Sequence, residues 1–220
     1  MHSLRKERTR DGCIDIGARR ELFVDNHLIE AMNGIELRLN QPTPQDVAID
    51  HDLPWEGNSS RYHTIFRDDD SFRMYYRGTQ TDLETDEYTH DQVTCYTEGQ
   101  MRGHSCQLRR FTLRLDRFVS AQARLNGGQL LTKPFFYKGS KLAINYSTSA
   151  AGSVRVEMRN VDGNPIQGFT FDESKETYGD HVERIVSWES GSNVSSISGM
   201  PVRLCFSLRD ADLFAFQFLQ

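Results

Sequence analysis

The sequence predicts an all-β protein built around an antiparallel, jelly-roll-like β-sandwich. From residue 110 onward, short apolar runs and turn signals follow one another at regular intervals. Several of these runs alternate apolar with polar residues, which is the period of a strand with one buried face. Almost no segment has the spacing of an amphipathic helix. A chain of 220 residues has room for one large all-β domain or two small ones.

The N-terminal part is expected to contain a tail followed by a β segment. Residues 1–12 are rich in Arg and Lys, which predicts a disordered tail. Residues 35–39 read Ile-Glu-Leu-Arg-Leu, the alternation of a half-buried strand. Three prolines at positions 42, 44 and 54 predict a long irregular stretch after it, because each proline lacks a backbone N–H and restricts the residue before it.

A β-hairpin is the natural interpretation of residues 62–77. Two runs of aromatic and β-branched residues, 62–66 and 72–77, flank the polar turn Arg-Asp-Asp-Asp-Ser at 67–71. An exposed loop and a short strand at 92–97 should follow. The run of residues from 99 to 109 contains two glycines and little periodicity, so we place a linker there between an N-terminal β segment (13–98) and a C-terminal sandwich (110–220).

The C-terminal sandwich should contain eight short strands. The almost unbroken apolar run at 213–219 predicts a strand covered on both faces, in the middle of a sheet. The expected strands are 111–115, 118–123, 128–132, 141–147, 153–160, 182–188, 201–209 and 213–219.

Composition disfavours several classes of partner. The net charge of −5 and the pI near 5.8 offer no basic footprint for nucleic acid. No apolar stretch approaches the roughly 20 residues of a membrane span, and no apolar run follows the charged N-terminus as in a signal peptide. We therefore expect neither nucleic acid nor a membrane as a partner, and the compartment is unknown. The four cysteines are scattered, which predicts free, mostly buried thiols.

Two stretches resemble one protein family. Residues 20–30, 54–58, 62–66, 72–78 and 93–98 are similar to the opening strand and first blade of glycoside hydrolases with a five-bladed β-propeller, related to the family 32 and family 43 enzymes. Residues 110–120, 127–134, 142–157 and 210–214 are similar to the C-terminal sandwich of the same proteins. Family members place further blades between these stretches, whereas about ten residues join them here. The resemblance implies a blade-like hairpin packed on a sandwich, with the central blades missing.

Hydrolysis of a glycosidic bond requires two carboxylates, one as acid and one as nucleophile or base. Asp25 and Glu56 are the weak candidates for a carboxylate surviving from the propeller. The second carboxylate would come from a missing blade, so no catalytic pair is identified. Asp25 also suits a turn at a strand end, and that is the more natural interpretation of it.

The best candidate for small-molecule binding surrounds Trp55. An aromatic face can stack on a sugar ring while carboxylate, amide and imidazole groups hydrogen-bond to its hydroxyls. The alternative is that the aromatic residues fill the hairpin core and Glu56 pairs with an arginine. Trp188 is a second aromatic candidate, for which a core role is favoured. The candidate ligand-binding residues are Trp55, Glu56, Asn58, Tyr62, His63 and Tyr76.

The sequence thus predicts a noncatalytic carbohydrate-binding or accessory sandwich protein derived from a glycoside hydrolase. The alternative is a glycoside hydrolase whose site is completed by oligomerisation. A homo-oligomer is expected, since a lone blade leaves strand edges and apolar surface to cover. No cofactor and no metal site are expected, because the histidines share no ligand spacing and the acidic residues between 162 and 180 have the character of a solvated loop.

Overall fold

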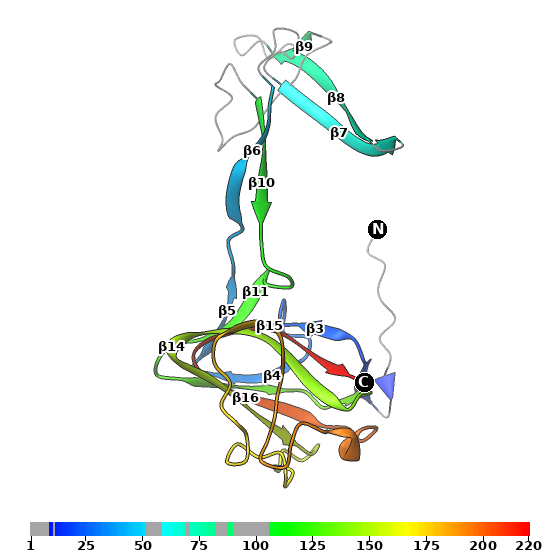
Figure 1. The fold of residues 1–220 in the computed structure, drawn as a ribbon. Helices are drawn as coiled ribbons and strands as arrows, with labels where there is room; N and C mark the ends of the chain where they lie inside the picture. Colours follow the sequence, from blue (N-terminus) through cyan, green and yellow to red (C-terminus); the bar gives the residue numbers. More distant parts are fainter. Residues whose placement is uncertain (1–8, 11, 52–58, 69–70, 82–87, 90–105) are drawn as a thin grey trace. The chain divides into compact units, whose positions relative to one another are not determined.

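A computed structural model describes residues 9–10, 12–51, 59–68, 71–81, 88–89 and 106–220 (Figure 1). These residues form β-strands and one 3-10 turn, with no α-helix among them, which confirms the predicted all-β class. The elements are β1 (Thr9–Arg10), β2 (Cys13–Gly17), β3 (Arg20–Leu22), β4 (Ile29–Asn33), β5 (Ile35–Leu39), β6 (Thr43–His51), β7 (Ser59–Asp68), β8 (Ser71–Thr81), β9 (Tyr88–Thr89), β10 (Cys106–Thr112), β11 (Val119–Ala123), β12 (Gly128–Thr132), β13 (Phe135–Tyr137), β14 (Lys141–Arg159), β15 (Asp180–Ile185), η1 (Ser195–Ile197) and β16 (Arg203–Leu219).

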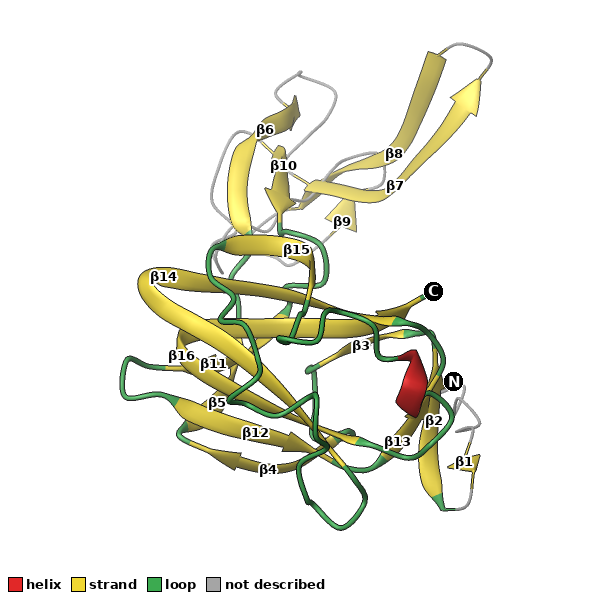
Figure 2. Ribbon diagram, turned by 60° about the horizontal axis from the view of Figure 1, so that its bottom comes forward, coloured by secondary structure: helices red, strands yellow, loops and turns green. Residues whose placement is uncertain are grey.

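The main sheet is built around two long antiparallel strands, β14 and β16 (Figure 2). β14 pairs with β16 along one edge and with β15 along its opposite edge. The other edge of β16 is shared by three shorter strands, β12, β11 and β3, and the first two of these pair in turn with β4 and β5. β16 therefore lies in the middle of the sheet, as its apolar sequence predicts. A smaller sheet contains β1, β2 and β13.

Each long strand replaces two expected short ones. The pairing of β14 with β16 shifts register between Thr148 and Ser153, and Asp210 has a φ of 44° at the matching point of β16. A Cβ on Gly152 would lie 2.3 Å from the carbonyl oxygen of Asp210, so only glycine allows this close approach. Bulges bend strands without ending them, and the sequence signals of a bend and of a turn are alike.

The chain divides into two compact units. The first unit comprises residues 1–41 and 113–220, and the second comprises residues 42–112. This division differs from the expected boundary at 99–109, because β2 to β5 pair with strands of the C-terminal half instead of forming part of a blade. The expected strand at 111–115 also differs, since β10 ends at Thr112. Strand pairing over long sequence separations leaves little local signal, so the boundary was not readable from the sequence.

The described residues of the second unit form two small antiparallel sheets. β6 pairs with β10, and β7 pairs with β8, which also pairs with β9. The pairing of Asp68 with Ser71 confirms the predicted hairpin and its position. The expected strand at 92–97 lies outside the described residues.

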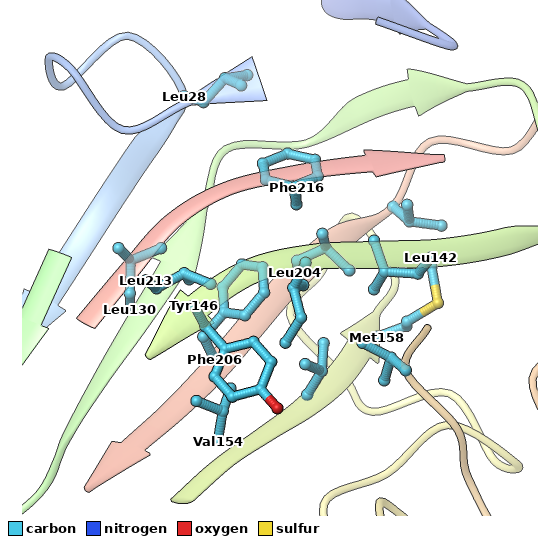
Figure 3. Close-up of a cluster of buried hydrophobic side chains, with 14 of the residues drawn as sticks. Leu28, Leu130, Leu142, Tyr146, Val154, Met158, Leu204, Phe206, Leu213 and Phe216 are labelled. Carbon is cyan, nitrogen blue, oxygen red and sulfur yellow. The ribbon is translucent and has the colours of Figure 1, made fainter. Parts of the chain in front are cut away.

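The core lies between the inner faces of the first unit (Figure 3). Alternate residues of β14 and β16 point into it, and residues from β4, β11, β12 and β13 close it. Trp188 is fully buried, its Nε1–H donates to the carbonyl of Val156 at 2.9 Å, and it meets the ring of Phe169 edge-on at 5.2 Å. Trp188 is thus a core residue and presents no platform for a sugar.

An irregular segment covers the outer edge of the second half of β14. Backbone hydrogen bonds join Val154 to Thr177 and Met158 to Phe169 and Ile166. Glu157 is 4% exposed, and its carboxylate accepts hydrogen bonds from the backbone N–H of Phe171 and from Arg159. The covering segment protects an edge that would otherwise be open to pairing.

Candidate functional site

A polar groove lies on the outer face of the main sheet, the face turned away from the core. It has a volume of about 590 Å³ and crosses β4, β12, β16 and β14. Its lining residues are Asn33, Asn126, Gly127, Gly128, Gln129, Ser153, Arg155, Glu176, Ser207, Leu208 and Arg209. We call this feature the sheet groove.

Strand register aligns four polar side chains across the sheet groove. Asn33 pairs with Gln129, Gln129 with Ser207, and Ser207 with Arg155. Each of the four neighbours a residue that packs in or against the core, namely Met32, Leu130, Phe206 and Val154, so each points outward. At about 4.8 Å per strand step, the row spans about 14 Å.

Close backbone contact shapes one end of the sheet groove. A Cβ on Gly128 would lie 2.6 Å from the carbonyl oxygen of Gly34 and 2.7 Å from that of Asn33. The turn between β4 and β5 therefore packs directly on the start of β12. This contact fixes Asn33 beside Gln129.

Positive charge is concentrated at the other end of the sheet groove. Arg155 Nε lies 3.8 Å from Oε1 of Glu176, a loose ion pair in which both side chains are substantially exposed. Arg209 pairs in register with Ser153, which places it diagonally across from Arg155, and no described residue forms an ion pair with it. Donor groups here thus face solvent with little internal competition.

A second polar cluster surrounds Arg117, which is 8% exposed. Its Nε donates to Oδ1 of Asn145 at 3.1 Å, and its Nη2 donates to the carbonyl of Tyr146 at 3.2 Å and to Asp180. The guanidinium carbon lies 4.5 Å from the ring centre of Phe214. These partners occupy the guanidinium on several sides, so the cluster fastens the loop before β11 to the sheet.

The Asp180 carboxylate is held by two arginines, Arg117 and Arg114. Burial alone would raise the pKa of this carboxyl, but the hydrogen bonds and positive charges of the two arginines outweigh burial and lower the pKa below its usual range. Asp180 is therefore ionised at neutral pH and serves as an anchor.

The sequence-predicted binding residues fall in the second unit. Trp55, Glu56 and Asn58 lie outside the described residues. Tyr62 and His63 are on β7 and Tyr76 is on β8. Arg61 pairs with Arg77 and Thr64 with Tyr75, so Tyr62 and His63 together oppose Tyr76 at a bulge. The register thus brings these three positions together.

Asp25 occupies a turn between β3 and β4. Its Oδ1 accepts the backbone N–H of His27 at 2.8 Å, which is the geometry of an Asx turn. The residue also lines a cavity of about 900 Å³ that includes the carboxylates of Asp15 and Glu21. Those two carboxylates accept from Gly17 N and from Arg19 respectively. The cavity's acidic groups are therefore engaged in local turns and ion pairs.

Other reactive groups are dispersed. Cys13 and Cys205 are free thiols, and burial raises the pKa of Cys205. Within the described ranges, no three His, Cys, Asp or Glu side chains converge to hold a metal ion. No helix in the described part of the chain is long and apolar enough to cross a membrane.

Sequence reasoning missed the sheet groove. The alternation of apolar and polar residues at 153–159 and 203–209 indicates only that Arg155 and Arg209 face outward on their own strands. It could not show that β12, β16 and β14 are neighbours. No protein-family model, curated protein or solved structure significantly matches the chain.

Proposed function

We propose that the chain is a noncatalytic carbohydrate-binding or accessory β-sandwich protein, and that the sheet groove is its saccharide-binding site. The observation that carries the proposal is the row Asn33, Gln129, Ser207 and Arg155 across four adjacent strands. The resemblance of the C-terminal half to the sandwich of glycoside hydrolases is consistent with this role and remains a prediction.

The chemistry of the sheet groove suits a polyhydroxylated ligand. Amides donate and accept, a serine hydroxyl does both, and guanidinium groups donate only. A sugar hydroxyl likewise donates and accepts, so neighbouring hydroxyls along a saccharide can bond to successive members of the row. Rigid strands hold these groups in place, which lowers the entropy cost of binding.

Binding without hydrolysis is the favoured form of the proposal. Among the lining residues the sheet groove has one carboxylate, Glu176, and this group is paired with Arg155. Glycoside hydrolysis by acid and nucleophile or base requires two carboxylates about 5 to 10 Å apart. The groove supplies positions for hydrogen bonding and no such pair.

A glycan array followed by calorimetric titration of the strongest ligand tests the proposal. We expect saturable binding by the intact chain. Gln129→Ala should weaken it about fivefold, because one lost hydrogen-bonding side chain is worth roughly 1 kcal/mol and 1.4 kcal/mol corresponds to a factor of ten. Ser207→Ala should weaken it by a smaller factor.

The matched control is Gln167→Ala, which removes an exposed amide of the same kind outside the sheet groove. Its affinity should equal that of the unmodified chain. A flat response to every saccharide would refute the proposal. Turnover of chromogenic glycosides would favour the hydrolase alternative instead.

A further inference from the structure

The open edge of β5 carries a self-complementary sequence. β5 pairs with β11 along one side, and no described strand pairs with its other side. Ile35 and Leu37 pack against the core, whereas Leu39, on the same face of the strand, is exposed. Glu36 and Arg38 on the opposite face are also exposed. Residues 35–39 thus follow the order apolar, acidic, apolar, basic, apolar. When an identical strand lies antiparallel beside this one, the acidic residue of each strand can face the basic residue of the other.

Backbone geometry determines which residues offer hydrogen bonds at that edge. The N–H of Asn40 donates to the carbonyl oxygen of Phe118, the residue immediately before β11, at 2.9 Å. Hydrogen-bonding direction alternates along an antiparallel strand, and the β5 and β11 register has no shift. Positions 36, 38 and 40 therefore face β11, and Ile35, Leu37 and Leu39 turn their N–H and C=O groups outward.

We propose that β5 is a dimerisation edge that pairs antiparallel with β5 of a second copy, with the two-fold axis at Leu37. This register opposes Leu37 to its own copy and Ile35 to Leu39 of the partner, all positions with outward hydrogen-bonding groups. It also opposes Glu36 to Arg38 of the partner subunit at non-hydrogen-bonded positions, where facing side chains are closest.

Neighbouring registers are less favourable. Shifting the two-fold axis by one position to residue 36 or 38 sets Glu36 against Glu36 or Arg38 against Arg38, and like charges directly opposite destabilise a strand pair. The proposed register instead forms two ion pairs by symmetry. It also places Leu39, which is 69% exposed, beside Ile35 of the partner subunit.

Existing contacts leave the two charges available. Arg124 Nη2 lies 3.9 Å from Oε1 of Glu36, with both side chains mostly exposed. Arg38 donates to Oε1 of Gln122 at 3.4 Å, a long hydrogen bond. Exchange of such contacts for a partner's opposite charge costs little.

Sedimentation equilibrium of the intact chain over a range of concentrations tests the dimer. We expect a reversible dimer whose dissociation constant rises about tenfold or more in Glu36→Arg, because both symmetric pairs become repulsive. Arg38→Glu should act in the same way. The double exchange, Glu36→Arg with Arg38→Glu, should restore the dimer to within about threefold, since it rebuilds the pairs in reverse.

Asp162→Arg is the matched control, because it makes the same charge change at an exposed residue away from β5. Thermal melting of each variant verifies folding, and the double exchange keeps the test decisive if a single variant is unstable.

Amide hydrogen exchange gives a second measurement of the dimer. The amides of Ile35, Leu37 and Leu39 should become protected as concentration rises, whereas those of Glu36 and Arg38 should be protected throughout. A monomer at about 100 μM, or a dimer indifferent to the charge exchanges, would overturn the proposal.

Discussion

Arg117 and Arg114 contact the same carboxylate, Asp180, from different surroundings. Arg117 has a 10% exposed side chain with further bonds to Asn145 and Tyr146, whereas the Arg114 side chain is 50% exposed. The two arginines therefore allow the stability contributed by a buried guanidinium to be compared with the stability contributed by a surface ion pair to the same carboxylate.

We expect Arg117→Met to lower the free energy of unfolding by about 2–4 kcal/mol, because Asn145 and the carbonyl of Tyr146 lose their donor in a buried setting. Arg114→Met is the matched control and should cost about 1 kcal/mol or less. Urea denaturation measures both values. Equal losses would contradict the structural role assigned to Arg117.

The same carboxylate gives a pH dependence. The pKa of Asp180 is lowered in the folded chain, so its contribution to stability is present above the unfolded value, about 3.9, and is lost as pH falls through the folded pKa. Asp180→Asn should therefore be less stable than the unmodified chain at pH 7. The gap in urea midpoints should close below about pH 4. A gap of constant size down to pH 2.5 would contradict this assignment.

At the level of strands, the sequence predicts which residues form a strand better than it predicts which strands pair with one another. The hairpin at β7 and β8 was predictable because both strands and their turn are contiguous. The apolar run at 213–219 identified the central strand. The pairing of β4 with β12 and of β5 with β11 joins residues far apart in the chain, so no local pattern encodes it. The sheet groove depends on that pairing, which is why its residues were not identified as a site.

Gly128 tests the packing that sets one end of the sheet groove. Gly128→Ala should destabilise the chain by about 3 kcal/mol, the upper end for overpacking, because the new methyl group meets backbone oxygens that cannot rotate away. Gly163→Ala is the control. It has a φ of 87° and open space around it, so only backbone strain of about 1 kcal/mol is expected. Thermal and urea unfolding compare the two variants, and equal costs would contradict the close approach.

For the molecule as a whole, the structure indicates a sandwich assembled from both ends of the chain. Residues 110–220 alone lack β2 to β5 and the core side chains of Ile16, Phe23 and Ile29. We expect that fragment to show no cooperative thermal transition. A chain in which Gln41 is joined to Leu113 by a short Gly-Ser linker should unfold cooperatively, because Leu39 and Val119 are already paired. Cooperative unfolding of 110–220 alone would contradict this assembly.

The proposed function is tested most directly by NMR titration of the intact chain with the best saccharide from the array. We predict that the largest amide shifts occur at Gln129, Arg155 and Ser207, with smaller shifts along β7 and β8. The largest shifts at Tyr62, His63 and Tyr76, with none in the sheet groove, would contradict the placement of the site on the sandwich.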